Sequence, residues 1–508
     1  MSASREKKKR FDERTDGVEK RQVRAKDGQK AQQRKKLITA VVAAAVVLVL
    51  LFLLVYNSTL FYTGVPAVKA GDWRFTAADF NYEYFNNYYN TYGNIYQSYG
   101  DYAYLLLDPN KPLDEQNYAE NQTWEQYFEE TAFEQLQQMA ILNDLGKQAG
   151  WSLSAEQKAE IDANIEGLKS SAASQGYSDY KAYIRAMYGK GITEKRLRQL
   201  LETSFYATYY SQDLTDGWKA GYTDEEKAAY YDGVRGEYDL VSFMEYFVSG
   251  AADDEAGIDA ATAMASASAT AANIAGAADQ ATFAEAVQLY APEDQKATYA
   301  DPDACLNYLT APAAMTNAEW KTWLTDPARF AGETKVFEST DGYYVLMYLE
   351  SNGNEYQLVN LRGIVIPVEK DETLGTVTDV TLSAAEAKVD EILAAYNEDP
   401  TEANFAALAD QYNTTGTSAG GLQENVPMGQ LAFREIEDYL FSDEAQPGAV
   451  KSFYNDGNYY VVYPLARGAQ YNYMVAENLM AQDQYVKLLD EHKPDYLIET
   501  ALGYSFTK

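Results

Sequence analysis

The sequence predicts an α+β multidomain protein with an N-terminal transmembrane helix, and three observations lead to this class. An apolar run of 20 residues without charge begins at Leu37. Segments whose apolar residues recur at helical spacing then fill residues 76–233. After residue 235 a series of strand, helix, helix and strand patterns occurs twice, and a last helical segment follows it.

The apolar run, Leu37–Tyr56, is long enough to be a membrane anchor. At about 1.5 Å per residue it spans roughly 30 Å, one bilayer core. Basic residues precede it, so the positive-inside rule places residues 1–36 in the cytoplasm and the body outside. We therefore expect a single-pass protein of the cell membrane. A cleaved signal peptide is the alternative, although its apolar region should be shorter and residues 57–64 (NSTLFYTG) make a poor cleavage site.

Charge separates a small basic tail from a large acidic body. Residues 1–36 hold 14 basic and 6 acidic residues, whereas the rest of the chain holds 28 basic and 70 acidic residues. The body therefore has a net charge of −42 and repels phosphate groups, which argues against a nucleic-acid partner. DNA binding by the tail alone is an alternative.

The counts of cysteine and histidine exclude several kinds of site. Cys305 is the one cysteine and His492 the one histidine. No intrachain disulfide is therefore possible, and neither Ser-His-Asp, Cys-His nor ordinary zinc sites can be assembled. We expect no metal and no cofactor.

Residues 65–234 are expected to form one helical domain behind a short strand. Thr76 with Asp79 and Ser154 with Gln157 are spaced as helix caps. The first helix carries an aromatic stripe that could hold unfolded segments by apolar contact, or could be buried as a core; its members are Phe80, Tyr82, Tyr84, Phe85, Tyr88 and Tyr89. Because several of them are adjacent in sequence, they cannot all face one core.

An internal duplication predicts two α/β modules, at residues 235–351 and 355–468. Three ordered pairs have nearly equal offsets of 118, 122 and 116 residues: Glu245 with Gly363, Phe283 with Phe405, and Tyr344 with Tyr460. Such ordered offsets indicate a repeat. Residues 469–508 are expected to form a C-terminal helix that packs back on the helical domain.

The second module contains several phrases that resemble parvulin motifs in their order. They are LVNLRGIVI (358–366), NFAALADQYN (404–413), SAGGL (418–422) and LFSDEAQPGAVKSFYNDGNYYVVYPL (440–465). The two glycines of SAGGL suit a turn that needs positive φ. Together with GITEKRLRQLL (191–201) in the helical block, this order resembles the membrane-attached or secreted foldases of the SurA/PrsA type, which carry parvulin-like (PpiC-type) peptidyl-prolyl isomerase modules. The resemblance covers about residues 65–508.

The chain departs from the family at the site itself. The family usually has one histidine on the first strand and another on the last, with an Asp or Cys near the loop. The corresponding positions here are Gly363, Tyr460 and Asn413–Thr415. In the first module they are Glu245 and Tyr344.

The resemblance implies a set of candidate site residues. Tyr460 is the catalytic candidate, because its hydroxyl could donate a hydrogen bond in place of the histidine. Leu431, Ile436 and Phe441 could wall a proline pocket, or simply form the core of the module. Tyr82, Phe85 and Tyr89 are the candidates for client binding in the helical domain.

Two function classes follow from the resemblance. The first is a membrane-anchored extracytoplasmic chaperone or foldase for unfolded or newly exported polypeptides. The second is an active peptidyl-prolyl cis-trans isomerase with an altered site in the second module. A structural adhesin or cell-wall scaffold is a third class, but it would not need a helical cradle.

Overall fold

The computed structural model describes most of the chain: residues 59–252, 257–371, 374–413 and 418–508, and, before residue 59, residues 7, 8, 10, 14, 35, 36 and 39–49. Of the predicted anchor Leu37–Tyr56, residues 39–49 are helical and exposed, and its other residues lie outside the described part. None of the described helices combines the length and the apolar composition that crossing a bilayer requires.

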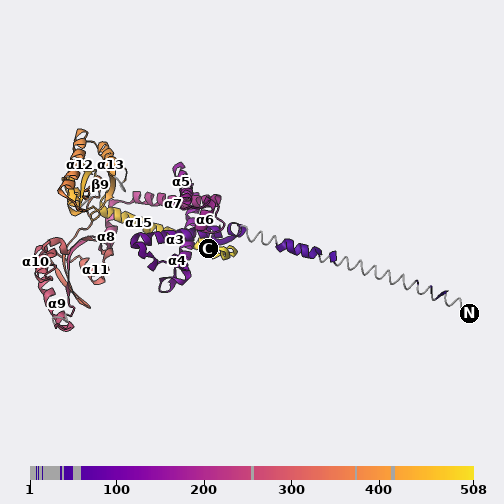
Figure 1. Ribbon diagram of the computed structural model, residues 1–508, viewed down its shortest axis with the longest axis horizontal. Coiled ribbons are helices and arrows are strands. Elements are labelled where there is room, and N and C mark those ends of the chain that lie inside the picture. The colour runs from indigo at the N-terminus through magenta and orange to yellow at the C-terminus, as the bar shows by residue number, and fades with distance from the viewer. Residues whose placement is uncertain are drawn as a thin grey trace. The chain divides into compact units, whose positions relative to one another are not determined.

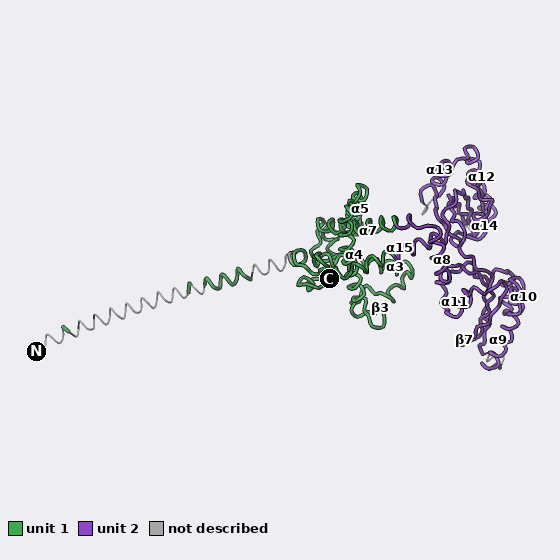
Figure 2. Tube along the Cα trace, turned by 180° about the vertical axis from the view of Figure 1, so that it is seen from behind, with its two compact units in different colours: residues 1–217, 484–508 green, residues 218–483 purple. Residues whose placement is uncertain are grey.

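The chain forms two compact units (Figure 2): residues 1–217 with 484–508, and residues 218–483. The first unit is mainly helical. Its helices, labelled in Figure 1, are α2 (Leu60–Thr63), α3 (Ala77–Tyr99), α4 (Trp124–Gln148), α5 (Ala155–Ser174), α6 (Tyr180–Tyr188) and most of α7 (Glu194–Gly221). The end of α15 (Tyr471–His492) also belongs to this unit.

A small antiparallel sheet in the first unit joins the segment that precedes α3 to the C-terminal segment. Its strand order is β13-β1-β2, from Ile498–Thr500, Pro66–Ala70 and Trp73–Thr76. Val68 of β1 lies opposite Thr500 of β13.

The sequence of residues 100–122 has no periodic pattern and predicts a loop, but the structure has short regular elements there. They are two 3-10 turns, η1 (Gly100–Leu105) and η2 (Leu113–Glu115), and a hairpin of β3 (Asn117–Ala119) with β4 (Gln122–Thr123). Elements of two to six residues are too short to give a periodic pattern, so the sequence does not reveal them.

Helix α3 begins at the predicted cap and is the centre of the unit. The Thr76 backbone N–H donates to the Asp79 carboxylate at 2.7 Å, and the Thr76 hydroxyl donates to the same carboxylate at 3.0 Å. Asp79 is buried and also receives Arg196 of α7, with Nε 2.8 Å from Oδ1 and a second contact from Nη2 to Oδ2. This pair ties the start of α3 to α7.

The second unit begins with α8 (Asp224–Tyr238) and contains two modules, each with a four-stranded antiparallel sheet. The first module consists of β5 (Val241–Ser249), α9 (Ala260–Ile274), α10 (Gln280–Tyr290), β6 (Leu306–Thr310), α11 (Ala318–Leu324), β7 (Thr334–Ser339) and β8 (Gly342–Ser351). The second consists of β9 (Val359–Pro367), α12 (Asp379–Glu398), α13 (Glu402–Tyr412), β10 (Leu422–Val426), α14 (Arg434–Phe441), β11 (Lys451–Asn455) and β12 (Asn458–Pro464).

The two modules have the same topology, and the register of their central strand pairs agrees from Phe243 and Leu361 onward. Their strand orders are β6-β5-β8-β7 and β10-β9-β12-β11. Glu245 lies opposite Leu346 in the first sheet, as Gly363 lies opposite Val462 in the second. Glu245 and Gly363 therefore occupy equivalent positions. The remaining 3-10 turns are η3 (Thr298–Ala300), η4 (Pro302–Cys305), η5 (Pro312–Ala314), η6 (Ala419–Gly421), η7 (Lys493–Tyr496) and η8 (Leu502–Phe506).

Each sheet of the second unit has two covered faces. In the second module α12 and α13 cover one face of β9, where they pack on Ile364 and Ile366 (Figure 1). The short helix α14 covers the other face, where it packs on Leu361 and Val462. Strand side chains alternate between faces, so this register decides which residues meet α14.

Replacing Arg196 with Met should lower the free energy of unfolding by about 3 kcal/mol, because it leaves the buried Asp79 carboxylate without its cation. The matched control is Arg198→Met on the same helix, since Arg198 pairs with Asp162 in an exposed contact. An exposed pair contributes at most about 1 kcal/mol. Urea unfolding measures the free energy of unfolding of both variants. Equal decreases would show that the buried Asp79–Arg196 pair contributes no more stability than the exposed pair.

Candidate functional site

The α14-covered face of the second module contains an apolar cavity of about 320 Å³. Strands β9 and β12 form its floor, because Leu361, Gly363 and Val365 share one face of β9 and Tyr460 and Val462 share the same face of β12. The cavity is lined by Leu361, Gly363, Ile364, Val365, Gln423, Gln430, Leu431, Ala432, Ile436, Tyr460 and Val462.

The sequence-predicted residues Tyr460, Leu431 and Ile436 come together around this cavity. Ile436 is buried on α14, and Leu431 lies in the segment that leads into that helix. The Tyr460 ring packs edge-on against Phe433, with ring centroids 5.1 Å apart. No described residue forms a hydrogen bond with the Tyr460 hydroxyl, so the hydroxyl is available to a ligand.

Phe441 does not line the cavity, which corrects the expectation that it walls a proline pocket. Its ring packs edge-on against Tyr356 at 5.3 Å, and Arg467 lies 5.9 Å from its centroid. Phe441 follows Ile436 by five residues, and this rotates its side chain by roughly 140° around the helix axis. Phe441 thus packs, partly buried, against the core cluster that contains Ile436, but only Ile436 lines the cavity.

Gly363 leaves room on the β9 side of the cavity. A Cβ atom built on Gly363 would have only the Gln423 side-chain nitrogen nearby, at 3.6 Å. The absence of a side chain here widens the cavity on the β9 side. Gln423 was not predicted from the sequence, because a polar residue in an exposed edge strand gives no distinctive pattern.

Asn413, the residue that follows α13, forms hydrogen bonds with the backbone in the middle of β9. Its side-chain oxygen accepts a hydrogen bond from the Val365 N–H at 3.0 Å, and its side-chain nitrogen donates to the Gly363 carbonyl at 3.0 Å. Asn413, the first residue of the predicted loop position Asn413–Thr415, thus fixes the β9 backbone beside Gly363. The other two residues of that predicted position, 414 and 415, lie outside the described residues.

In the first module, aromatic side chains occupy the place that is equivalent to this cavity. Tyr344 packs against Phe247 at 4.6 Å and against Trp320 of α11 at 4.8 Å. Glu245 is half-buried and accepts a hydrogen bond from Asn307 at 3.2 Å, and burial raises the pKa of its carboxyl. The register makes Asn307 equivalent to Gln423, so both modules have an amide at this position, whereas only the first has an acid beside it.

The predicted client-binding residues of α3 are packed inside the first unit. Tyr82 is 7% exposed and its ring lies 5.0 Å from that of Tyr188 on α6. The Tyr89 hydroxyl donates to the Met187 carbonyl at 3.1 Å, and Phe85 packs edge-on against Tyr84. The expected open aromatic surface is therefore a core in this half of α3.

Exposed aromatic side chains occur instead at the end of α3 and in η1. Five residues there are each exposed by half or more: Tyr96, Tyr99, Tyr102, Tyr104 and Leu105. The sequence signal for them is the run YGNIYQSYGDYAYLLL (92–107), whose tyrosines are too many for one buried face; the core covers Ala103 and Leu107 of this run.

Comparison with known proteins gives structural neighbours only. No protein-family profile and no curated protein matches the chain. The similar solved structures include peptidylprolyl isomerase PrsA from Bacillus anthracis, with 13% identity over 43% of this chain and 79% of that one and a TM-score of 0.19. PrsA from Bacillus subtilis has 15% identity over 58% and 94% of the two chains and a TM-score of 0.14. Foldase protein PrsA from Streptococcus pneumoniae has 15% identity over 59% and 94% and a TM-score of 0.20. Similarity at this level assigns neither an activity nor site residues.

Substitutions at Gly421, in the tight turn, and at Gly363, beside the cavity, should have different effects on the free energy of unfolding. Gly421 has φ of +63°, as the SAGGL motif predicts, and a Cβ there would lie 2.2 Å from the Gly363 carbonyl oxygen. Gly421→Ala should therefore lower the free energy of unfolding by at least about 2 kcal/mol.

Gly363→Ala is the matched control, and we expect it to be neutral or to stabilise by up to about 1 kcal/mol, since glycine weakens a strand interior. Denaturant unfolding monitored by tryptophan fluorescence measures both variants. A large loss for Gly363→Ala would show that the space at Gly363 is not open.

Proposed function

We propose that this chain is an extracytoplasmic chaperone or foldase for unfolded or newly exported polypeptides, and that its second module holds one apolar client side chain, such as a proline ring. The observation that carries the proposal is the uncharged, mostly apolar cavity between β9, β12 and α14. The order of parvulin-like motifs in the same module supports it.

The size and lining of the cavity suit a single side chain. Its volume of about 320 Å³ is at the lower end of the range of roughly 300–1,000 Å³ for small-molecule pockets. Burial of about 100 Å² of apolar surface would contribute roughly 2–3 kcal/mol to binding. That free energy corresponds to a change in affinity of about 30–160-fold.

A second function, peptidyl-prolyl isomerisation, is favoured by two unoccupied donors at the cavity. The Tyr460 hydroxyl and the Gln423 amide have no hydrogen-bond partner among the described residues. Isomerisation breaks no σ-bond, and its barrier of about 18–20 kcal/mol comes from amide resonance. An apolar site that hydrogen-bonds the twisted amide lowers this barrier without a nucleophile or a histidine.

Filling the cavity tests client binding. Gly363→Leu should weaken binding of an unfolded, proline-containing client at least tenfold and should reduce the suppression of its aggregation. Gly167→Leu is the control, because a Cβ at Gly167 meets open space on an exposed helix. Fluorescence anisotropy with a labelled client measures affinity, and unchanged affinity in Gly363→Leu would contradict the proposal.

A protease-coupled proline assay separates the two functions. If the module is an isomerase, Tyr460→Phe and Gln423→Leu should each lower kcat/KM by about 10–100-fold, mainly through kcat, because both donors act on the twisted amide. If it is only a binding module, wild-type protein should give no rate enhancement while still suppressing aggregation. Absence of both effects would reject both functions.

Membrane anchoring through Leu37–Tyr56 is part of the proposal. The full chain should remain in the membrane pellet after alkaline carbonate extraction, whereas a variant lacking residues 37–56 should be released. A variant lacking residues 2–36 controls for the basic tail. Release of the full chain by carbonate, or loss of residues before 57 from the mature protein, would contradict an uncleaved anchor.

A further inference from the structure

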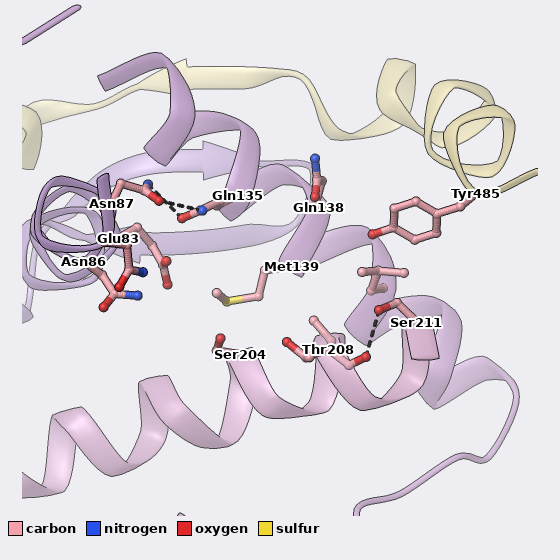
Figure 3. A pocket seen from close by; sticks show the side chains of 13 residues that line it. Glu83, Asn86, Asn87, Gln135, Gln138, Met139, Ser204, Thr208, Ser211 and Tyr485 are labelled. Atoms are coloured by element: carbon pink, nitrogen blue, oxygen red, sulfur yellow. Dashed lines mark hydrogen bonds between the residues drawn. The ribbon is translucent and has the colours of Figure 1, made fainter. Parts of the chain in front are cut away.

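A polar pocket of about 250 Å³ lies within the first unit, where α3, α4 and α7 meet (Figure 3). Each helix contributes four residues at the spacing i, i+3, i+4 and i+7, which is one helix face. They are Glu83, Asn86, Asn87 and Asn90 of α3, Gln135, Gln138, Met139 and Leu142 of α4, and Ser204, Ala207, Thr208 and Ser211 of α7, and Tyr485 of α15 completes the lining.

The composition of these faces is unusual for the meeting point of three helices. Facing helices in a domain normally bury apolar stripes, because a polar group without a partner is costly to bury. Here most lining side chains are carboxyl, amide or hydroxyl groups. Among these polar groups Glu83 is buried, Asn90 and Thr208 are exposed, and the others are half-buried. A hollow whose polar groups surround one buried carboxyl group without a partner is a candidate ligand site.

Glu83 is the group in the pocket that most needs a ligand. It is 5% exposed, and its Oε1 has no hydrogen-bond partner among the described residues. Figure 3 shows its carboxyl group turned toward the space into which Met139 and Ser204 also project. Burial, with a smaller effect of Asp79, raises the pKa of the Glu83 carboxyl to about 8.

The surrounding side chains offer hydrogen-bond acceptors but no cation. Asn87 and Gln135 satisfy each other through two hydrogen bonds of 3.0 and 2.8 Å. The side chains of Asn86, Gln138 and Ser204 form no hydrogen bond with any described residue, so their oxygens are available. None of the described lining residues is Lys, Arg or His.

The other charged and titratable groups near Glu83 do not supply a counter-ion. Asp79 is held by Arg196, and these two charges already compensate each other. Tyr82 and Tyr188 lie close to Glu83, and burial raises the pKa of both hydroxyls, to about 12 for Tyr188, so they stay neutral. Burial also raises the pKa of Tyr485 in the lining.

We propose that this pocket binds an alkylammonium group, with Glu83 as its counter-ion and the free amide and hydroxyl oxygens as acceptors for its N–H donors. An ammonium group presents three donors and no acceptor, which fits such a lining. The pocket is smaller than those that hold drug-sized ligands, so it suits one aminoalkyl chain. A lysine side chain of a polypeptide and a free amine share this chemistry.

Calorimetric titration of the full chain with n-butylammonium chloride at constant ionic strength tests the proposal. We expect saturable binding that is weakened at least tenfold in Glu83→Gln and is unchanged in Glu134→Gln, an exposed glutamate of α4. Ser204→Leu, which fills the pocket from α7 without touching the carboxyl, should also abolish binding. Circular dichroism confirms that each variant is folded.

Two matched probes sharpen the result. n-Butanol has the same chain without the charge and should not bind; equal binding of n-butanol, or full binding in Glu83→Gln, would overturn the proposal. Below pH 8 the apparent affinity for n-butylammonium should fall by up to about tenfold per pH unit in the wild type, because Glu83 must ionise. A pH-independent affinity would also overturn it.

A lysine-containing peptide and its acetyl-lysine counterpart distinguish the two sources of the ligand. Binding of n-butylammonium and of the lysine peptide, but not of the acetyl-lysine peptide, supports a lysine side chain as the ligand. Binding of n-butylammonium but of neither peptide supports a free amine, and no binding of n-butylammonium would overturn the proposal. This pocket and the cavity beside Tyr460 lie in different units. Gly363→Leu should leave butylammonium binding unchanged, so failure of one proposal is distinguishable from failure of the other.

Discussion

The pairing of β9 with β12 is the constraint on which the candidate site depends. Because Gly363 lies opposite Val462 and Tyr460 opposite Val365, all four residues face α14 and none faces α12 or α13. A slip of one residue would turn every one of these side chains to the other face. Asn413 and the close approach of Gly421 to the Gly363 carbonyl both hold this part of β9 in place.

The two modules share one topology but differ in the side chains at equivalent positions of their sheets. At equivalent positions the first module has Glu245 with Asn307, and the second has Gly363 with Gln423. In both modules an aromatic ring packs edge-on against the tyrosine, Trp320 on Tyr344 and Phe433 on Tyr460. The first module adds Phe247 against Tyr344 where the second has Val365, and a cavity remains beside Tyr460. The second module is distinguished by the absence of a side chain at Gly363, not by the presence of a reactive group.

Much of the secondary structure could be predicted from the sequence, since the caps at Thr76 and Ser154 and the positive φ of Gly420 and Gly421 agree with the structure. The site was predicted less well. Helical periodicity identifies apolar faces but does not say which of them another element covers. The sequence therefore left open whether Tyr82 lies on a binding surface or in a core, and it lies in a core. The polar pocket around Glu83 could not be predicted, because its residues come from helices distant in sequence and each polar face alone suggests a solvated surface.

The central claim is that the cavity beside Tyr460 receives a client side chain. The most direct measurement is a methyl NMR titration of the chain with an unfolded, proline-containing peptide. The account predicts chemical-shift changes at the methyl groups of Leu431, Ile436 and Val462, and little change at Leu408 in the core on the opposite face of the sheet. Changes confined to other parts of the chain, with the methyl groups of Leu431 and Ile436 unmoved at saturation, would contradict it.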